Sequence, residues 1–313
     1  MGNWKILLTD GLEENGQAIL REVAQVDDRS GISADELLTV VGDYDAMIVR
    51  GRTKVTAAVL DAAKKLKAVG RAGVGVDNID LKTAASKGVT VVNSPSATTL
   101  AVAELTLGLM LAIVREIPRA DAGIKGGKWL KKEMKGGELW KKTLGVIGFG
   151  RIGSAVAQRA AAFDMTVIAY DPFLPGEEIQ KRGARPVSLD ELLAQADVIT
   201  MHLPLTADTR DLLDSAAFAK MKDGVRVVCA ARGGVINEDA LLQALESGKV
   251  AAAGLDVFTS EPPGESPLAK HPHVVATPHI GAQTQEAQVR AADDISNEVL
   301  AALDGKPLRW KVN

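Results

Sequence analysis

Short apolar runs alternate with amphipathic segments along almost the whole chain. In the first third of the chain such runs lie at 5–9, 46–49, 66–70 and 89–92. Short apolar runs separated by helical patterns are typical of parallel strands in βαβ units rather than of hairpins. The intervening helices are expected over residues 13–23, 34–41, 57–63 and 81–86. The pattern therefore predicts a small α/β unit at the start of the chain.

A second and longer set of apolar runs begins at residue 143. Its predicted strands cover residues 143–147, 166–170, 198–201, 225–229, 252–255 and 274–276. Helical patterns separate them, which predicts a doubly wound parallel sheet of the Rossmann type. An amphipathic helix is expected over 283–303, where Asp304-Gly305 ends it. The apolar segment 101–114 contains Glu104 and is too short to cross a bilayer, so we interpret it as a buried helix.

The length and charge of the chain limit its possible partners. At 313 residues the chain is long enough for two ordinary domains. Its 37 basic and 40 acidic residues give a net charge of -3, which provides neither a positive field for nucleic acid nor a basic membrane face. The lysine-rich segment 125–142, with Trp129 and Trp140, is interpreted as a solvated loop or a subunit contact. A small molecule is therefore the expected partner.

The cysteine content and the N-terminus bear on the cellular compartment. Cys229 has no second cysteine with which to pair, so a disulfide and a cysteine metal cage are excluded. The N-terminus shows neither a basic leader nor a small-residue cleavage site. His271 and His273 have no acidic or cysteine partners at metal-ligand spacing. We therefore expect a cytoplasmic protein without a bound metal.

The segment Gly148-Phe-Gly-Arg-Ile-Gly153 fits the pattern G-x-G-x-x-G between a predicted strand and an alanine-rich helix. In a dinucleotide-binding turn Gly148 allows the tight bend, Gly150 lets the backbone approach a pyrophosphate, and Gly153 lets the helix pack on the strand. Free amides at the positive end of that helix would hold the phosphates. Pattern and context together predict a cofactor domain.

Asp171 ends the next predicted strand, at the place where a carboxylate receives the ribose hydroxyls of adenosine. Its negative charge would repel a 2′-phosphate, so the sequence favours NAD over NADP. The alternative interpretation is that Asp171 only stabilises the turn before Pro172.

Three further polar residues follow predicted strands, at the carboxyl edge where open α/β sheets bind ligands. Arg232 precedes two glycines and can hold a substrate carboxylate with its guanidinium. Glu261 and His279 follow the next two strands, and a carboxylate beside an imidazole favours a ring that accepts or releases a proton near neutral pH. Taken singly, each also fits a structural role in a surface ion pair, a loop or the core. His202, at another strand end, is expected to line the nicotinamide site rather than to bind metal.

With these residues in place, the chain resembles the D-isomer-specific 2-hydroxyacid dehydrogenases. The similar segments occur in order at 49–56, 70–78, 148–153, 231–234, 255–258, 261–262 and 278–281. The resemblance implies two doubly wound α/β domains of Rossmann-like or flavodoxin-like type. A substrate-binding domain would comprise residues 1–97 and 284–313, with the NAD-binding domain, residues 98–283, inserted into it. The resemblance also implies a homodimer or homotetramer.

The resemblance further assigns roles to individual residues. In the catalytic set, His279 would take the hydroxyl proton, Glu261 would stabilise the resulting imidazolium, and Arg232 would hold the substrate. Substrate contacts would come from Arg50, Val74, Gly75, Arg232 and His279. Cofactor contacts would come from Val74, Gly148, Gly150, Arg151, Ile152, Gly153, Asp171, His202, Leu203, Pro204, Ala230, Ala231, Arg232, Asp256, His279, Gly281 and Ala282.

The expected activity is NAD-linked oxidation of D-3-phosphoglycerate to 3-phosphohydroxypyruvate, the first step of serine biosynthesis. Arg50, Arg52 and Arg71 are the candidates for meeting a phosphate as well as a carboxylate. A glyoxylate or hydroxypyruvate reductase, or another D-2-hydroxyacid dehydrogenase, would use the same catalytic residues. A corepressor-like sensor of NAD(H) would share the fold but convert no substrate.

Overall fold

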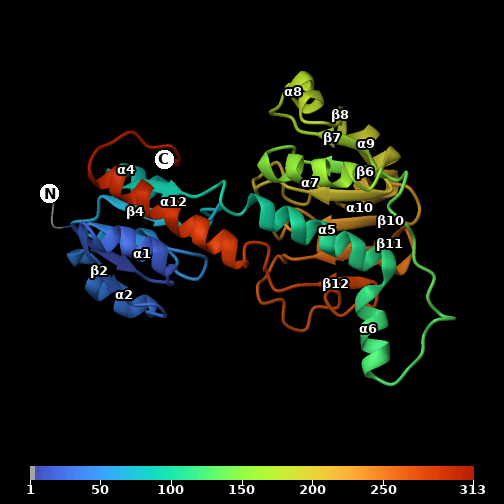
Figure 1. Cartoon of the computed structure of the whole chain (residues 1–313), viewed down its shortest axis with the longest axis horizontal. Helices are drawn as coiled ribbons and strands as arrows, with labels where there is room; N and C mark the ends of the chain where they lie inside the picture. Colours follow the sequence, from blue (N-terminus) through green and yellow to red (C-terminus); the bar gives the residue numbers. More distant parts are fainter. Residues whose placement is uncertain (1–3) are drawn as a thin grey trace. The chain divides into compact units, whose positions relative to one another are not determined.

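A computed structural model describes residues 4–313, which form two compact units (Figure 1). The first unit comprises the chain up to Thr98 together with Ala282–Asn313. The second unit is the continuous segment Thr99–Gly281. The chain therefore leaves the first unit, builds the whole of the second, and returns.

The first unit is built on a five-stranded sheet with the order β2-β1-β3-β4-β5. Its strands are β1 (Trp4–Leu8), β2 (Ala24–Asp28), β3 (Ala46–Val49), β4 (Ala68–Arg71) and β5 (Thr90–Asn93). Every neighbouring pair is parallel, and this strand order is that of a flavodoxin-like doubly wound sheet. The helices are α1 (Glu14–Arg21), α2 (Ala34–Val40), the 3-10 turn η1 (Val41–Asp43), α3 (Ala57–Ala62), α4 (Leu81–Ser86) and α12 (Gln285–Leu303).

Helix α12, from the end of the chain, packs on the first sheet and on α1. Glycines allow this close approach: a Cβ at Gly70 in β4 would lie 2.5 Å from a methyl group of Val299. A Cβ at Gly16 in α1 would lie 2.8 Å from Ala292. Buried α12 side chains such as Ile295 share one apolar cluster with β1, β3 and β4. The returning chain thus completes the core of the first unit.

The second unit contains a seven-stranded parallel sheet with the order β12-β11-β10-β9-β6-β7-β8. Its strands are β6 (Thr143–Ile147), β7 (Thr166–Tyr170), β8 (Arg185–Pro186), β9 (Val198–Met201), β10 (Val225–Cys229), β11 (Val250–Leu255) and β12 (Val274–Ala276). This is the Rossmann order, extended by one strand. The order reverses between β6 and β9, and ligands bind open α/β sheets at such a switch point.

Helices cover both faces of the second sheet (Figure 1). They are α5 (Thr99–Arg115), α6 (Ile117–Lys125), α7 (Arg151–Ala161), α8 (Gly176–Lys181), α9 (Leu189–Gln195), α10 (Ser215–Lys220) and α11 (Glu238–Glu246). The core on one face contains side chains of α5 and α7, and the core on the other contains those of α9, α10 and α11. Within the described residues 4–313, no helix is long and apolar enough to cross a membrane.

The predicted fold class, two doubly wound parallel α/β units, is confirmed, and five of the seven strands of the second sheet begin and end as predicted. The sequence pattern missed β2 and β8. Both are edge strands, and β2 reads Ala-Gln-Val-Asp-Asp without an apolar run. Helix α6 was also missed, because Pro118 stands at its start and six of its nine residues are polar or small. These three elements therefore carry a weak apolar signal in the sequence.

Candidate cofactor and catalytic site

The glycine-rich turn lies directly after β6, and each of its three glycines is required for a different physical reason. Gly148 has φ 85°, and a Cβ there would lie 2.6 Å from the carbonyl oxygen of His202. A Cβ at Gly153, in the first turn of α7, would lie 2.1 Å from the Gly148 oxygen. Gly150, the residue before α7, faces open space, with nothing within 4 Å of its Cβ position. That open space beside the start of α7 fits the pyrophosphate of a dinucleotide.

Asp171 lies at the end of β7 and holds the glycine turn. Its carboxylate accepts hydrogen bonds from the backbone N–H of Phe149 at 2.8 Å and from that of Phe173 at 2.9 Å. The carbonyl oxygen of Phe149 accepts a hydrogen bond from Arg182 at 3.2 Å. Asp171 therefore makes the contacts expected of a residue that stabilises the turn, which was the alternative interpretation of this aspartate. A carboxylate offers about four lone-pair positions, so two remain for ribose hydroxyls.

His202 follows β9 and borders the same turn. Its ring Nε2 lies 3.0 Å from the hydroxyl of Thr200, and its Nδ1 is buried without a hydrogen-bond partner in the described part of the chain. Burial lowers the pKa of His202 to about 3, so the ring is neutral at physiological pH and is no proton relay there. Leu203 packs beside Gly148, and Pro204, the next residue, is exposed.

His279 and Glu261 form a direct pair. Nδ1 of His279 lies 2.7 Å from Oε2 of Glu261, while Oε1 of Glu261 accepts from the N–H of Phe258 at 3.1 Å. The side chains are 48% and 38% exposed, so small molecules can reach them. Because Nδ1 donates its hydrogen to the carboxylate, the lone pair of the neutral ring is on Nε2. The pair therefore presents one basic nitrogen to solvent.

Asp256, after β11, fixes the turn that carries His279. Its side chain accepts from the hydroxyl of Thr277 at 2.6 Å and from the backbone N–H groups of Ile280 and Gly281, both at 2.8 Å. The residue is 1% exposed. His279 has a left-handed backbone, with φ 53°, which costs a residue with a side chain about 1 kcal/mol. The sequence assigned a cofactor contact to Asp256, and the contacts present here give its carboxylate a positioning role.

The turn that carries Arg232 is joined to the loop that carries Glu261. A Cβ at Gly233 would lie only 1.9 Å from the carbonyl oxygen of Phe258, so the two backbones touch. Glu238, the first residue of α11, accepts from the N–H of Thr259 at 2.6 Å. The segments after β10, β11 and β12 thus form one connected assembly. Sequence reasoning missed Glu238, because its partner is 21 positions away and nothing in the local pattern marks it.

Arg232 itself is half-buried, and its Nη1 donates to the carbonyl oxygen of Ala231 at 2.7 Å. Ala230 and Ala231, between β10 and Arg232, are buried. Cys229, at the end of β10, is buried too, and burial raises the pKa of its thiol to about 11. The thiol is therefore protonated and unreactive at neutral pH.

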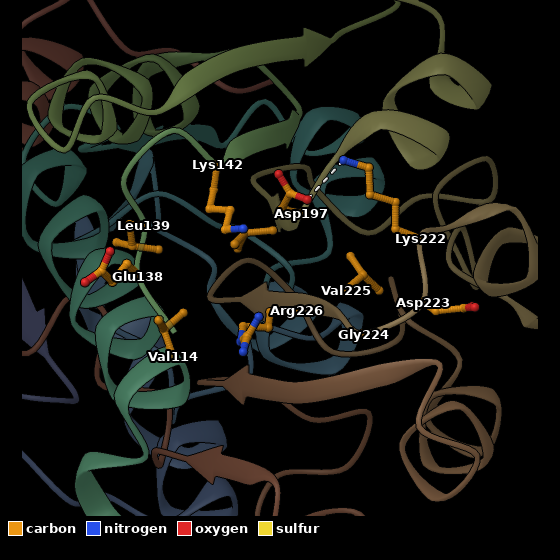
Figure 2. Close-up of a pocket in the computed structure, with 11 residues that line it drawn as sticks. Val114, Glu138, Leu139, Lys142, Asp197, Lys222, Asp223, Gly224, Val225 and Arg226 are labelled. Atoms are coloured by element: carbon orange, nitrogen blue, oxygen red, sulfur yellow. Dashed lines mark hydrogen bonds and ion pairs between the residues drawn. The ribbon is translucent and has the colours of Figure 1, made fainter. Parts of the chain in front are cut away.

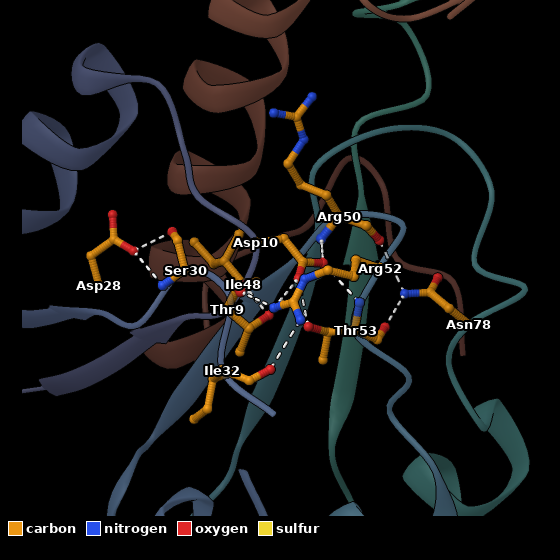
Figure 3. A network of polar contacts seen from close by, with 10 residues as sticks. All are labelled: Thr9, Asp10, Asp28, Ser30, Ile32, Ile48, Arg50, Arg52, Thr53 and Asn78. Carbon is orange, nitrogen blue, oxygen red and sulfur yellow. Dashed lines mark hydrogen bonds and ion pairs between the residues drawn. The ribbon is translucent and has the colours of Figure 1, made fainter. Parts of the chain in front are cut away.

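In the first unit, a network around Asp10 shapes the loop after β3 (Figure 3). The Asp10 carboxylate accepts from the backbone N–H groups of Arg50 and Thr53, at 2.8 and 3.1 Å. Arg52 donates to the carbonyl oxygens of Thr9 and Ile32 and also pairs with Asp10 at 3.2 Å. The guanidinium of Arg52 therefore has a structural role in this loop, while its side chain is 50% exposed, so phosphate binding by Arg52 stays a prediction.

Arg50 differs from Arg52, because its side chain extends away from this network and forms no hydrogen bond or ion pair within the described residues (Figure 3). The loop after β4 carries Val74 and Gly75. Asn93 donates to the carbonyl oxygen of Val74 at 2.7 Å, while the N–H groups of Val74 and Gly75 have no hydrogen-bond acceptor in the part of the chain that is described. A guanidinium and two free amides are the donor types that hold an oxyanion.

The remaining cofactor candidates lie at the ends of the same elements. Arg151 and Ile152 begin α7 at the glycine turn, and Gly281 and Ala282 follow His279. Gly281 is held against Asp256, with its Cβ position 3.1 Å from a carboxylate oxygen. The carboxyl edge of the second sheet thus gathers the glycine turn, Asp171 and the pair of His279 and Glu261.

A Rossmann sheet with a glycine-rich turn at its switch point, and an imidazole-carboxylate pair at the ends of neighbouring strands, defines a dinucleotide-binding protein of the dehydrogenase type. Residues 107–281 match the model of the D-isomer specific 2-hydroxyacid dehydrogenase NAD-binding domain. The chain belongs to this family, and its second unit is an NAD-binding domain.

Individual relatives agree with this family. The D-3-phosphoglycerate dehydrogenase of Methanocaldococcus jannaschii is 49% identical over 99% of this chain and 59% of its own length. A glyoxylate reductase from Paecilomyes thermophila superposes with a TM-score of 0.91 at 34% identity, over 100% of this chain and 99% of that one. A D-lactate dehydrogenase from Aquifex aeolicus, solved with NAD and lactic acid, gives a TM-score of 0.83 at 31% identity, with 96% of each chain covered. The chain spans little more than half the length of the curated relatives that it matches.

Proposed function

We propose that this protein oxidises D-3-phosphoglycerate to 3-phosphohydroxypyruvate with NAD, a reaction that opens serine biosynthesis. The observation that carries the proposal is 45% to 49% identity, over 99% of the chain, to proteins named D-3-phosphoglycerate dehydrogenase. The exposed pair of His279 and Glu261 supports it, because removal of a hydroxyl proton needs a positioned base.

NAD, when bound, accepts the hydride from carbon 2 of the substrate. The chain supplies the proton transfer: Nε2 of His279 takes the hydroxyl proton as the hydride leaves. Glu261, hydrogen-bonded to Nδ1, holds the ring in the required orientation and stabilises its positive charge. Asp256 keeps His279 in its left-handed turn. Arg232 binds the substrate carboxylate through two parallel N–H hydrogen bonds. Glu238 positions the loop of Glu261 through Thr259.

Arg50 and the free amides of Val74 and Gly75 are proposed to bind a substrate oxyanion, which makes the first unit the substrate-binding domain. This assignment rests on donors without acceptors in the described chain. A homodimer or homotetramer in the cytoplasm is also proposed. Supporting the oligomer, Trp129 and Trp140 are 77% and 55% exposed, which is unusual for aromatic side chains of this size.

The substrate proposal predicts a strong preference for a phosphorylated substrate. We expect kcat/KM for D-3-phosphoglycerate to exceed that for D-glycerate and D-lactate by at least about 100-fold, because a dianion adds two or more charge-assisted hydrogen bonds. Initial rates of NADH formation across a panel of 2-hydroxy acids, and of NADH loss with 2-oxo acids, measure this. Equal rates with and without the phosphate would reject the substrate, and a preference for glyoxylate would favour the reductase. That second candidate is supported by full-length similarity to the glyoxylate reductase.

The cofactor proposal predicts that the charge of Asp171 selects NAD. Asp171→Asn removes the negative charge and keeps one oxygen that can accept from the N–H of Phe149, while the N–H of Phe173 loses its acceptor. The glycine turn should therefore persist, because its own contact is the one to Phe149. We expect the ratio of NADH to NADPH affinity to fall at least about tenfold, because repulsion of the 2′-phosphate is lost. Fluorescence titrations with both cofactors measure it, with Asp190→Asn as an exposed control. An unchanged ratio would show that Asp171 serves the turn alone.

A further inference from the structure

The NAD-binding unit has a second pocket, at the edge of its sheet opposite the glycine turn. A cavity of about 190 Å³ lies at the amino ends of β9 and β10, beside Lys142, which precedes β6 (Figure 2). The end of α5 and residues Glu138 and Leu139 complete its wall. The five residues of β6 separate this edge from the glycine turn by about 15 Å. The pocket is therefore distinct from the NAD site.

Two of the three acids in the lining are already engaged. Asp197 accepts from the N–H of Thr143 at 2.8 Å and pairs with Lys222 at 3.0 Å. Asp223 pairs with Lys249, and its side chain is 92% exposed. The third acid, Glu138, has its carboxylate turned away from Arg226 (Figure 2). None of the three therefore neutralises the guanidinium of Arg226.

Two cations in the lining form no ion pair in the described residues, although the charge of Lys142 is felt by Asp197, whose pKa it helps to lower. Arg226 is half-buried on the central strand β10, and its Nε is fully buried without a hydrogen-bond partner in the described residues. Neither Arg226 nor Lys142 forms an ion pair in residues 4–313. A half-buried guanidinium without an acceptor is unfavourable, because it has lost water without gaining hydrogen bonds. Arg226 therefore provides a buried donor in the pocket whose hydrogen bond is not made within the described residues.

We propose that this pocket binds a small oxyanion, a phosphate or a carboxylate. The guanidinium of Arg226 and the ammonium of Lys142 supply the donors, and the pair of Asp197 and Lys222 forms a fixed polar wall. Arg226 presents a planar fork that matches either group. Such a ligand stabilises the folded state, and this stabilisation grows with the logarithm of ligand concentration above the dissociation constant. The site is independent of the proposed catalytic reaction.

Titration of inorganic phosphate into the isotopically labelled full chain at low ionic strength tests this site. The side-chain Nε–H resonance of Arg226, assigned by its loss in Arg226→Met, reports contact directly. We expect saturable shifts in the wild type and at least about tenfold weaker binding at the site in Lys142→Met, which removes one charge-assisted contact. Two matched controls should keep the wild-type affinity at this resonance: Lys220→Met, an exposed lysine paired with Asp190, and Arg50→Met.

Several outcomes would overturn the proposal: an unmoved Arg226 resonance, wild-type affinity in Lys142→Met, or equal weakening in Lys220→Met, which would indicate general screening. Lys142 is exposed, so its variant decides the matter even if Arg226→Met does not fold. Malonate in place of phosphate distinguishes the two ligand classes. NADH titrations of both variants should match the wild type, since neither residue lies at the glycine turn. If the panel of 2-hydroxy acids shows no preference for a phosphorylated substrate, the outcome of the phosphate titration at Arg226 is unaffected.

Discussion

Replacing His279 with alanine is expected to reduce turnover by about 10²- to 10⁴-fold, the usual size of a general acid-base contribution. The variant removes the imidazole that Oε2 of Glu261 holds by a hydrogen bond. NADH affinity should be nearly unchanged, because the glycine turn and Asp171 do not depend on the imidazole. Steady-state rates and fluorescence titration measure the two quantities separately.

The left-handed backbone of His279 requires a second variant. Alanine at φ 53° adds strain, whereas asparagine tolerates this conformation. His279→Asn should therefore lose turnover as fully as His279→Ala while keeping the stability of the wild type. His273→Ala, at an exposed histidine outside the pair, should remain fully active. Substantial turnover in His279→Asn would remove the proton-transfer role from this residue.

The parts of the fold that could be predicted are those with a local sequence signal. The central strands are buried on both faces, so their apolar runs mark them, and β6, β7, β9 and β10 were predicted with their observed bounds. The edge strand β12 was also predicted with its observed bounds, because its three residues are all apolar. The glycine turn was predictable because each glycine acts within a few residues of its own position or on the adjoining strand end. The two missed edge strands, β2 and β8, contain no apolar run and therefore lack that signal.

The contacts that position the catalytic residues could not be predicted. Asp256 reaches Gly281 across 25 positions, and Glu238 reaches Thr259 across 21. Such pairs are created by the parallel arrangement of β10, β11 and β12, which places consecutive loops side by side. The contacts of Arg52 could not be predicted either. Its hydrogen bonds to the carbonyl oxygens of Thr9 and Ile32 depend on the packing of loops that are distant in the sequence. Residue type suggested phosphate binding by Arg52, and the tertiary contacts add a structural role that residue type does not indicate.

Replacing Gly150 with valine is expected to abolish cofactor binding while leaving the protein stable. The Gly150 backbone is extended, with φ -71° and ψ -153°, and nothing lies within 4 Å of its Cβ position. The added side chain therefore meets no protein atom at its Cβ and occupies the space where the pyrophosphate must approach the helix start. Loss of about two charge-assisted hydrogen bonds predicts a rise in the NADH dissociation constant of at least about 100-fold.

Gly153→Val is the matched comparison, because a change in the same motif should then lower stability as well as NADH binding. A Cβ at Gly153 would lie 2.1 Å from the Gly148 oxygen, so this variant should lose free energy of unfolding as well as NADH binding. Gly108→Ala, in open space on α5, should leave NADH binding intact. Denaturant titration and NADH fluorescence distinguish the three variants. If Gly150→Val bound NADH as tightly as the wild type, the dinucleotide would have to lie elsewhere than at the start of α7.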